Sequence, residues 1–341
     1  FIGKNLVNYF LKKSNYNIIN YDSLVYSSNN NLDIKKLNKK KYFFFKGDIN
    51  NQKKINEILK LFKPFAIINL AAESHVDRSI DDPLPFIKTN INGTFNLLTS
   101  SLRYYNSLKI KEKKIFRFIH ISTDEVYGDL NFNSKPFEET NKYIPSSPYS
   151  ASKASSDHLV HSWFKTFNFP SIITNCSNNY GSYQHPEKFI PHVILSCILK
   201  KKIPIYGNGM QIRDWIHVDD HCEAISKILK NGSIGESYNI GSDNEQKNIF
   251  IAKSICKIFD KLNNKFKYSK LIKFVEDRPG HDKRYAINSK KIKKDTGWSA
   301  SIDFNKGLEE TVMWYIINSD WWLKIIKSKY KLQRIGKINK K

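Results

Sequence analysis

Short apolar runs alternate with helix-like segments through the first half of the chain. The apolar runs, each short enough for a buried strand, are residues 17–22, 42–46, 65–70, 115–121 and 171–176. The helix-like segments are residues 3–13, 51–62, 85–102 and 148–167. Strands that are apolar on both faces and alternate with helices are typical of a parallel sheet covered on both sides. The sequence therefore predicts an α/β fold with a doubly wound parallel sheet.

The pattern loosens after Asn178. The later half has polar loops, several glycines and short elements, and we expect two late strands at residues 213–218 and 237–240. This change fits a smaller second region that returns to the sheet at least once. A chain of 341 residues is long enough for two such parts.

The net charge of +24 has two interpretations. One is a nucleic-acid or anionic-membrane partner. The other, which we favour, is a lysine-rich surface, because Lys, Asn and Ile are abundant together throughout the chain. No apolar run reaches the ~18–20 residues of a membrane span. The four cysteines are widely spaced, which indicates reduced structural thiols in a cytosolic protein and no metal site.

Two residues in the first half suit a dinucleotide. Gly3 opens a helix, where the last glycine of a phosphate-binding loop would lie. Asp22 ends the next strand roughly 20 residues later, where a carboxylate binds the adenosine ribose, although a solvated turn residue is an equal alternative. No Arg follows at residues 23–25, which favours NAD over NADP. Asp48 fits either an adenine contact or the cap of the helix near Asn51.

Acid and base groups follow one of the predicted strands. The run Ser122-Thr123-Asp124-Glu125-Val126-Tyr127-Gly128 comes directly after residues 115–121. Ligands of open α/β sheets bind beyond the carboxyl ends of the strands, so we expect Thr123, Asp124 and Glu125 in the crevice. Tyr149 and Lys153 lie one helical turn apart and share a face. A neighbouring ammonium together with the positive ring of a nicotinamide would lower the pKa of the phenol, which would let Tyr149 act as a base.

These segments together resemble the extended short-chain dehydrogenase/reductases, and among them the nucleotide-sugar 4,6-dehydratases. The resemblance runs from Phe1 to about Trp314, and its segments are residues 71–79, 122–128, 149–153, 175–181, 213–215 and 277–281. The adjacent Asp124 and Glu125 distinguish dehydratases from related 4-epimerases and decarboxylases. The resemblance implies a Rossmann-like fold, NAD as cofactor, a cytoplasmic location and a homodimer, with neither a nucleic-acid nor a membrane partner.

The resemblance also implies a reaction, the dehydration of dTDP-glucose to dTDP-4-keto-6-deoxyglucose in deoxysugar and cell-surface polysaccharide biosynthesis. Tyr149, supported by Lys153, would accept the C4 hydroxyl proton as hydride moves from C4 to NAD⁺. Glu125 would remove the C5 hydrogen, Asp124 would protonate the departing C6 hydroxyl, and hydride would return to C6. Thr123 would position the sugar. Elimination needs one group to take a proton and another to give one. Two adjacent buried carboxylates should titrate as a pair with separated pKa values.

The remaining implied site residues fall into two sets. Those for NAD are Phe1, Ile2, Asp22, Asp48, Ile49, Leu70, Ala71, Ala72, Ser74, Thr89, Tyr149, Lys153 and Asn179. Those for the substrate are Ser74, Thr123, Asn178, Lys188, Phe189, Pro204, Ile205, Tyr206, Arg213, Asn248, Asp277, Arg278 and His281. Arg213 and Arg278 suit a diphosphate, which takes bidentate guanidinium contacts. His75 and His281 form no ligand cluster, so we predict no metal.

The same resemblance divides the chain. We expect an NAD-binding domain at residues 1–177 with returning segments near 212–242. A substrate-binding region of mixed α/β structure is expected at 178–211 and 243–320, and a frayed basic tail at 321–341. The family's first strand and earlier loop glycines would precede Phe1 in a longer gene product, so we expect a gap in the sheet and weak NAD binding by a chain beginning at Phe1.

Three alternatives stay open. A dehydratase could act on UDP- or CDP-glucose, and a 4-epimerase would make no 6-deoxy product. A non-catalytic nucleotide-binding or nucleic-acid-binding relative is motivated by the charge of +24. The intact acid–base set argues against that last alternative.

Overall fold

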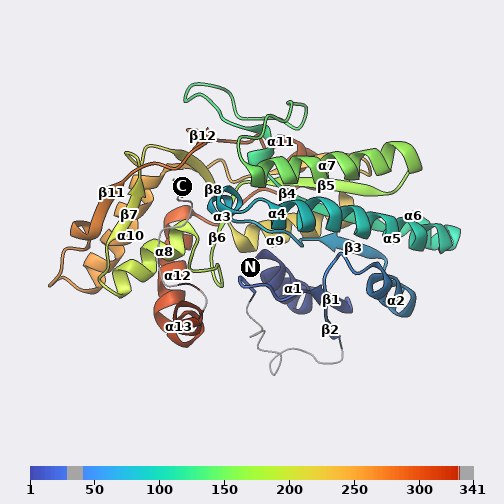
Figure 1. Ribbon diagram of the computed structural model, residues 1–341, viewed down its shortest axis with the longest axis horizontal. Coiled ribbons are helices and arrows are strands. Elements are labelled where there is room, and N and C mark those ends of the chain that lie inside the picture. The colour runs from blue at the N-terminus through green and yellow to red at the C-terminus, as the bar shows by residue number, and fades with distance from the viewer. Residues whose placement is uncertain (29–40, 329, 331–341) are drawn as a thin grey trace.

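The chain folds into two parts that lie side by side, a larger part built on a parallel sheet and a smaller mixed part (Figure 1). The computed structural model describes residues 1–28, 41–328 and 330. Within these ranges no helix is both long and apolar enough to cross a membrane. All four cysteines are free and buried, which confirms the expectation of structural thiols.

A four-stranded parallel sheet forms the centre of the larger part. Its strands, in the order β3-β4-β5-β9, are β3 (Ala66–Asn69), β4 (Arg117–Thr123), β5 (Ser171–Cys176) and β9 (Ser237–Ile240). Crossovers between these strands run through helices, as the alternation in the sequence predicted. The parallel α/β fold is therefore confirmed.

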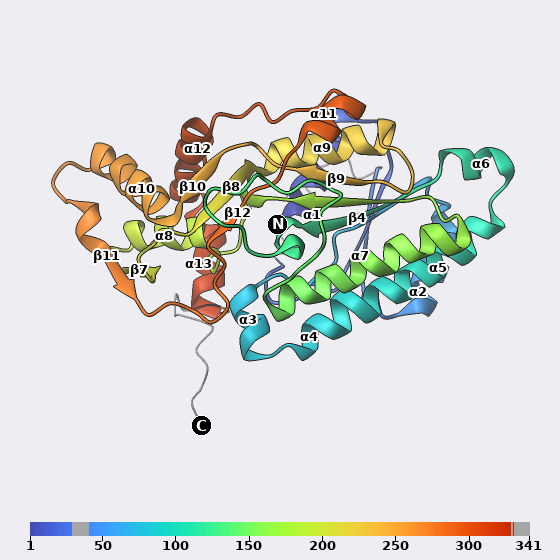
Figure 2. The same cartoon turned by 90° about the horizontal axis from the view of Figure 1, so that it is seen from above.

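Helices cover both faces of this sheet (Figure 2). One face packs against α2 (Gln52–Phe62), α5 (Thr94–Ser107) and α7 (Pro148–Phe167), and the other against α1 (Ile2–Lys13), α9 (Val218–Asn231) and α11 (Lys290–Thr296). Neighbouring residues of β4 divide between the two cores, because strand side chains alternate. Phe118 belongs to the first cluster, whereas Ile119 and Ile121 belong to the second. This division makes β4 apolar on both faces.

A separate parallel pair, β1 (Ile18–Asp22) and β2 (Tyr42–Lys46), lies beside β3 without pairing to it among the described residues. Helix α1 bridges the gap, because Leu6 and Phe10 pack in one cluster with Ile18 of β1 and Ile68 of β3. The gap that the sequence predicted in the sheet is present at this position.

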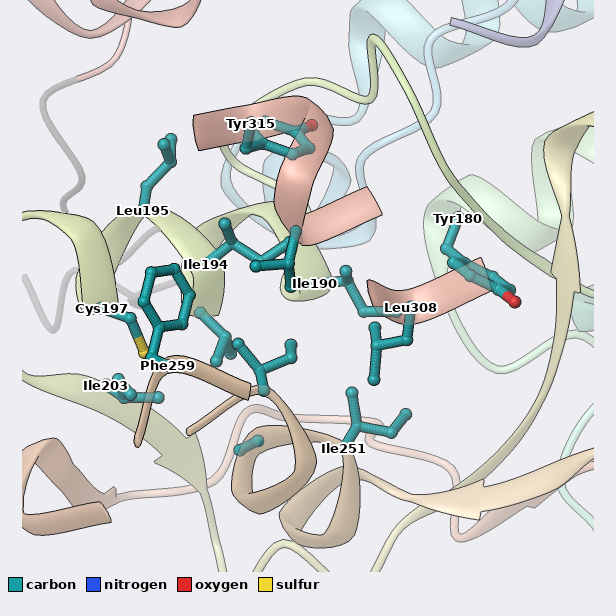
Figure 3. Packing of buried hydrophobic residues seen from close by; sticks show 14 of the residues in the cluster. Tyr180, Ile190, Ile194, Leu195, Cys197, Ile203, Ile251, Phe259, Leu308 and Tyr315 are labelled. Atoms are coloured by element: carbon teal, nitrogen blue, oxygen red, sulfur yellow. The ribbon is translucent and has the colours of Figure 1, made fainter. Parts of the chain in front are cut away.

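The smaller part has its own strands and helices. Strand β8 (Ile212–His217) pairs with β6 (Asn178–Tyr180), β10 (Glu245–Lys247) and β12 (Arg284–Tyr285), while β7 (Ile203–Tyr206) pairs with β11 (Ile272–Val275). The helices are α8 (Phe189–Ile198), α10 (Asn248–Leu262), α12 (Phe304–Ile317), α13 (Ser319–Ser328) and the short 3-10 helix η3 (Tyr268–Leu271). Ile190, Ile194 and Ile251 point toward one another in its core (Figure 3).

Three details differ from the sequence-based expectations. The helix expected at residues 85–102 is a series of α4 (Leu84–Phe86), the π-helix η1 (Ile87–Gly93) and α5. Strand β4 begins at Arg117, because the short helix α6 (Ile110–Ile115) occupies the preceding residues. Strand β8 pairs inside the smaller part, so of the two late strands only β9 joins the four-stranded sheet.

The expected tail was wrong over its first residues. Helix α13 continues to Ser328 and buries Trp321, Trp322 and Ile325 against the smaller part. These apolar side chains recur at helical spacing among the lysines, and that spacing outweighed the basic composition. Residues 329 and 331–341 of the expected tail lie outside the described residues.

Candidate active site

A cavity of about 1140 Å³ lies at the carboxyl ends of β1, β3, β4 and β5 and extends to the smaller part. Almost all of the site residues expected from the sequence line it. They are Phe1, Ile2, Asp22, Asp48, Ile49, Leu70, Ala71, Ala72, Ser74, Thr89, Thr123, Glu125, Tyr149, Lys153, Asn178, Asn179, Lys188, Phe189, Pro204, Ile205, Tyr206, Arg213, Asn248, Arg278 and His281. Asp124 and Asp277 are not among the lining residues: Asp277 is exposed, whereas Asp124 is buried next to the cavity, with its Oδ1 atom 3.4 Å from the hydroxyl of the lining residue Thr123.

The two adjacent carboxyl groups sit on a single turn of 3-10 helix, η2 (Asp124–Tyr127), at the end of β4. Thr123 caps this turn, since its hydroxyl accepts a hydrogen bond from the backbone N–H of Glu125 at 3.3 Å. Gly128 ends the turn with a φ of 89°, a conformation that favours glycine. The local sequence thus fixes the direction of both carboxyl side chains.

Their surroundings separate the two groups electrostatically. Burial raises the pKa of Asp124 well above its usual value, and the nearby carboxylates of Glu125 and Asp214 add to this rise. Burial also raises the pKa of Glu125, but Arg278 and the two further cations Arg213 and Lys188 oppose the rise. Asp124 is therefore suited to hold a proton, while Glu125 faces a more positive field.

Tyr149 and Lys153 come from α7, which begins at Pro148 after a Ser147 cap. The Ser147 hydroxyl accepts from the backbone N–H of Ser150 at 3.1 Å, so helix entry is fixed just before the tyrosine. Lys153 is 3% exposed and donates from Nζ to the carbonyl of Ile121 in β4 at 2.8 Å. This bond ties the helix to the strand that carries the carboxyl groups.

For the protein's own residues alone, the pKa of Tyr149 lies above its ordinary value. Burial raises it well above the ordinary value, and the charge of Glu125 raises it further, while a side-chain hydrogen bond with Thr123 opposes the rise. Desolvation is the largest of these effects. A lowered pKa of Tyr149 therefore needs positive charge beyond that of the protein's own residues.

At the β1 end of the cavity, two carboxylates are held by local backbone bonds. Asp22 accepts from the backbone N–H of Leu24 at 2.7 Å, and Asp48 accepts from that of Asn50 at 2.8 Å. The cap of α2 is Asn51, whose side chain accepts from Lys54 N, so Asp48 is not the helix cap. Both carboxylates therefore keep a fixed orientation beside the cavity.

The donor set of this end fits a dinucleotide. Ala71 and Ala72 leave room for a flat group at the end of β3, and Asp22 is placed as an acceptor for a ribose hydroxyl. Asn178 lines the cavity with a buried Oδ1 atom that has no hydrogen-bond partner in the described part of the protein. An orphaned acceptor of this kind calls for a donor from a ligand or water.

The opposite end of the cavity is positively charged. Arg213 donates to the carbonyls of Ile212 at 2.8 Å and Asp282 at 2.9 Å, which fixes the guanidinium group. Arg278 donates to Asp77 at 2.6 Å. Lys188, the residue before α8, donates to the carbonyl of Ser74 at 2.5 Å. Three oriented cations suit an anionic group such as a diphosphate.

Sequence reasoning missed several lining residues, among them His75, Asp77, Glu187 and Tyr285. Each is next to or near a selected motif residue, but its partner is distant in the sequence. The hydroxyl of Tyr26, for example, donates to Glu187 at 2.8 Å across 161 positions. The one signal in the sequence that could have identified these lining residues was their closeness along the chain to a motif residue.

In the described ranges no group of three or more His, Cys, Asp or Glu side chains is placed to hold a metal ion. Thr123, Glu125, Tyr149 and Lys153 are brought together at one cavity by β4 and α7. Such a set can hold and move protons around a bound hydroxyl group.

Comparisons with known proteins find 4,6-dehydratases both by sequence and by structure. The family model described as GDP-mannose 4,6 dehydratase matches residues 1–311. The dTDP-glucose 4,6-dehydratase of Neisseria meningitidis is 46% identical over 341 aligned residues, which cover 98% of this chain and 96% of that protein. The solved structure of dTDP-glucose 4,6-dehydratase from Bacillus anthracis in complex with NAD superposes with a TM-score of 0.85 at 41% identity, covering 95% of this chain and 96% of the other. A dTDP-glucose 4,6-dehydratase from Streptomyces venezuelae, also with NAD, gives 0.86 at 35% identity and covers 95% and 97%.

Proposed function

The chain belongs to the GDP-mannose 4,6-dehydratase family, and from that premise we propose that it converts dTDP-glucose to dTDP-4-keto-6-deoxyglucose with NAD as cofactor. The observation that carries this proposal is the Asp124–Glu125 pair at the end of β4, beside Tyr149 and Lys153 of α7. Oxidation at one carbon needs a single base, which Tyr149 can supply. Elimination of water needs a further base and an acid, which the two carboxyl groups can supply.

NAD would be held by Asp22 at the ribose, by Leu70 to Ala72 along the flat rings, and by Lys153 near the nicotinamide. When bound, it supplies a hydride acceptor for C4 and then a hydride donor for C6. Its positive ring adds the charge that the Tyr149 phenol lacks in the protein alone. The high pKa of Tyr149 therefore fits a base that becomes active when the cofactor is present.

Each protein side chain then has one proton to hold or move. The Tyr149 phenolate, favoured once the positive cofactor is bound, would take the proton of the C4 hydroxyl, and Thr123 would hold the sugar beside it. The Glu125 carboxylate takes the C5 proton after oxidation has made that proton acidic, and gives a proton back to C5 when hydride has been delivered to C6. Asp124 gives its proton to the leaving C6 hydroxyl, which the raised pKa of this carboxyl group favours. Arg213, Arg278 and Lys188 bind the diphosphate.

Product analysis tests this proposal. The protein is incubated with NAD⁺ and, in separate reactions, with dTDP-glucose, UDP-glucose, CDP-glucose or GDP-mannose, and the sugar products are identified by NMR. We expect a 4-keto-6-deoxy sugar from dTDP-glucose at the highest kcat/KM. If only one of the other nucleotide sugars gives such a product, that sugar is the substrate instead of dTDP-glucose. A 4-epimer, or salt-sensitive DNA binding without turnover, would contradict the proposal.

We also propose that residues 1–177, with segments near 212–242, bind NAD, and that 178–211 and 243–320 bind the nucleotide sugar. The separate apolar cores of the two parts support this division. One refinement is that Ile292 and Trp298 pack in a core of the larger part, next to α9. Limited proteolysis with and without each ligand should protect the two regions separately.

A homodimer is proposed through the outer face of α5 and α7, which run alongside each other (Figure 2). Phe95 and Phe167 are 45% and 47% exposed, and the Trp163 ring lies 5.9 Å and 5.5 Å from theirs. A row of exposed aromatic side chains marks an interaction surface. In sedimentation experiments Phe95→Glu should give a monomer, whereas Phe250→Glu, at an equally exposed site on α10, should not. A dimeric Phe95→Glu protein would contradict this interface.

We propose a cytoplasmic location, where free thiols stay reduced and nucleotide sugars are made. The buried free state of Cys176, Cys197, Cys222 and Cys256 supports it. Fractionation of the cells that make the protein tests this location, and recovery in an oxidising compartment would contradict it.

A further inference from the structure

A buried polar cluster lies behind Lys153, on the side away from the cavity. His120 of β4 and Asp157 of α7 are each 1% exposed. The Nε2 atom of His120 is 3.4 Å from Lys153 Nζ and 3.4 Å from the Oδ1 atom of Asp157. His120 therefore stands between a buried ammonium and a buried carboxylate, and the mechanism above assigns it no task.

Its neighbours fix the protonation of His120. The Oδ1 atom of Asn69 accepts from the backbone N–H of Ala71 at 3.3 Å, so the Asn69 amide nitrogen faces His120 Nδ1 at 3.1 Å. Nδ1 must then accept, which places the ring proton on Nε2. The Ser156 hydroxyl donates to the carbonyl of Lys153 at 2.8 Å and can accept from Nε2–H at 3.1 Å.

His120 is thus a neutral group. Burial lowers its pKa to about 4, and the charge of Lys153 lowers it as well. A second cation beside Lys153 would compete with the ammonium for the same buried carboxylate. The neutral ring avoids this competition and still places a polar N–H toward Asp157.

Asp157 supplies the negative charge of the cluster. Its Oδ2 atom accepts from the Ser122 hydroxyl at 2.7 Å and from the Asn175 amide at 3.4 Å. Burial lowers the pKa of Lys153, and among the charges that oppose this effect Asp157 is the largest, followed by the Cys176 thiol. Tyr149, on the same helix, lines the cavity together with Lys153.

We propose that Asp157, screened by neutral His120, is a positioning residue that keeps Lys153 protonated and directed at the reacting centre. The proposal rests on the function proposed above, because Lys153 is useful there only as an ammonium. Asp157 lies one helical turn beyond Lys153, so a single helix carries both the charge and its counter-charge. The bond from Lys153 to Ile121 then sets the direction of the ammonium.

The test is Asp157→Asn, which removes the charge and keeps the shape. The first readout is the titration of Lys153 by NMR of ¹³C-labelled lysine, with the resonance assigned through Lys153→Met. We expect the pKa of Lys153 to fall by about one unit or more, as loss of a close opposite charge does. The second readout is the pH profile of kcat with dTDP-glucose, whose alkaline limb should move to lower pH by the same amount.

Three variants keep the test decisive. Asp220→Asn removes a carboxylate that is also buried but binds Ser301 and Ile302 away from the cavity, and it should leave both readouts unchanged. His120→Gln keeps a neutral side chain and should not move the alkaline limb. If Asp157→Asn does not fold, the smaller neutral Asp157→Ser replaces it.

An unchanged Lys153 titration in the Asp157 variant would overturn the proposal, as would an alkaline limb that moves in the Asp220 variant. Failure of the proposed function has a different signature. In that case the unmodified protein makes no 4-keto-6-deoxy sugar, while the Lys153 titration can still shift.

Discussion

The guanidinium group of Arg78 meets the buried carboxylate of Glu187 through two contacts, at 3.0 Å from Nε and 2.9 Å from Nη2. The same carboxylate accepts from the Tyr26 hydroxyl at 2.8 Å, and the Arg78 guanidinium lies 4.0 Å from the centre of the Tyr26 ring. Glu187 therefore joins the segment after β1, helix α3 (Val76–Asp81) and the segment that carries Lys188. Two ends of the cavity are connected through one carboxylate.

Glu187→Gln should lower both stability and substrate affinity. Loss of the charge leaves Arg78 unpaired, but Arg78 is one-third exposed and regains some hydration, so we expect a cost of about 2 kcal/mol rather than the full cost of a broken buried pair. KM for the nucleotide sugar should rise more than kcat falls, since Lys188 loses its support. Urea unfolding and steady-state kinetics measure these effects. Glu236→Gln, which removes an exposed pair with Lys291, is the control, and equal losses in both variants would contradict the role of Glu187.

Asp124→Asn should abolish turnover and stabilise the fold. The pKa of Asp124 is raised by burial and by Glu125, so the folded protein retains a proton that the unfolded chain releases above pH ~4. Stability of the unmodified protein therefore falls as pH rises above ~4, by up to about 1.4 kcal/mol per pH unit, until the raised pKa is passed. The Asp124→Asn variant has no carboxyl group at this position and does not lose stability in this way. The difference between its Tm and that of the unmodified protein should therefore grow with pH. A Tm difference that is constant or shrinks with rising pH would contradict the raised pKa.

Acid should unfold the protein below pH ~6.5. Burial lowers the pKa of His75, His120, His185 and His192 to about 4, and that of His221 to about 3. The unfolded chain binds protons at these sites near pH 6.5, where the folded protein does not. The neutral buried histidines therefore stabilise the folded protein fully above pH ~6.5. Their contribution to the free energy of unfolding is lost as pH falls toward 4, on the order of 1 kcal/mol per pH unit for each histidine. Urea midpoints measured from pH 7 to 4.5 in the Asp124→Asn variant, which lacks the opposing contribution of Asp124, test this, and midpoints that stay level in that variant would contradict it.

Gly128→Ala should displace the carboxyl pair. At a φ of 89°, an added Cβ would collide with the backbone carbonyl of Ile144, so the turn that follows Glu125 must shift. We expect a loss of at least about 2 kcal/mol in the free energy of unfolding and a large fall in kcat. Gly297→Ala is a matched control, because its φ is 71° but an added Cβ meets nothing within 4 Å. That variant should lose about 1 kcal/mol and keep its activity. Equal stability losses would contradict the steric argument.

The sequence predicted the sheet and the meeting of Thr123, Glu125, Tyr149 and Lys153 at one cavity, because both depend on local pattern. The apolar run before Ser122 and the capped helix at Pro148 each gave a boundary close to the observed one. The helices of the smaller part were missed: α8 is apolar nearly all round and so has no helical alternation of apolar and polar residues, whereas lysines interrupt the apolar spacing of α10. Contacts between segments that are distant in the sequence were also missed, because no local pattern records them. The Tyr26–Glu187 contact is of the same kind.

The fate of the C4 hydrogen tests the proposed reaction most directly. dTDP-glucose deuterated at C4 is incubated with the protein and NAD⁺, and the position of the label in the product is read by NMR. If oxidation, elimination through Glu125 and Asp124, and reduction occur in one active site, the label moves from C4 to C6 of a 4-keto-6-deoxy sugar. Return of the label to C4, or loss of the label without a 6-deoxy product, would contradict the proposal.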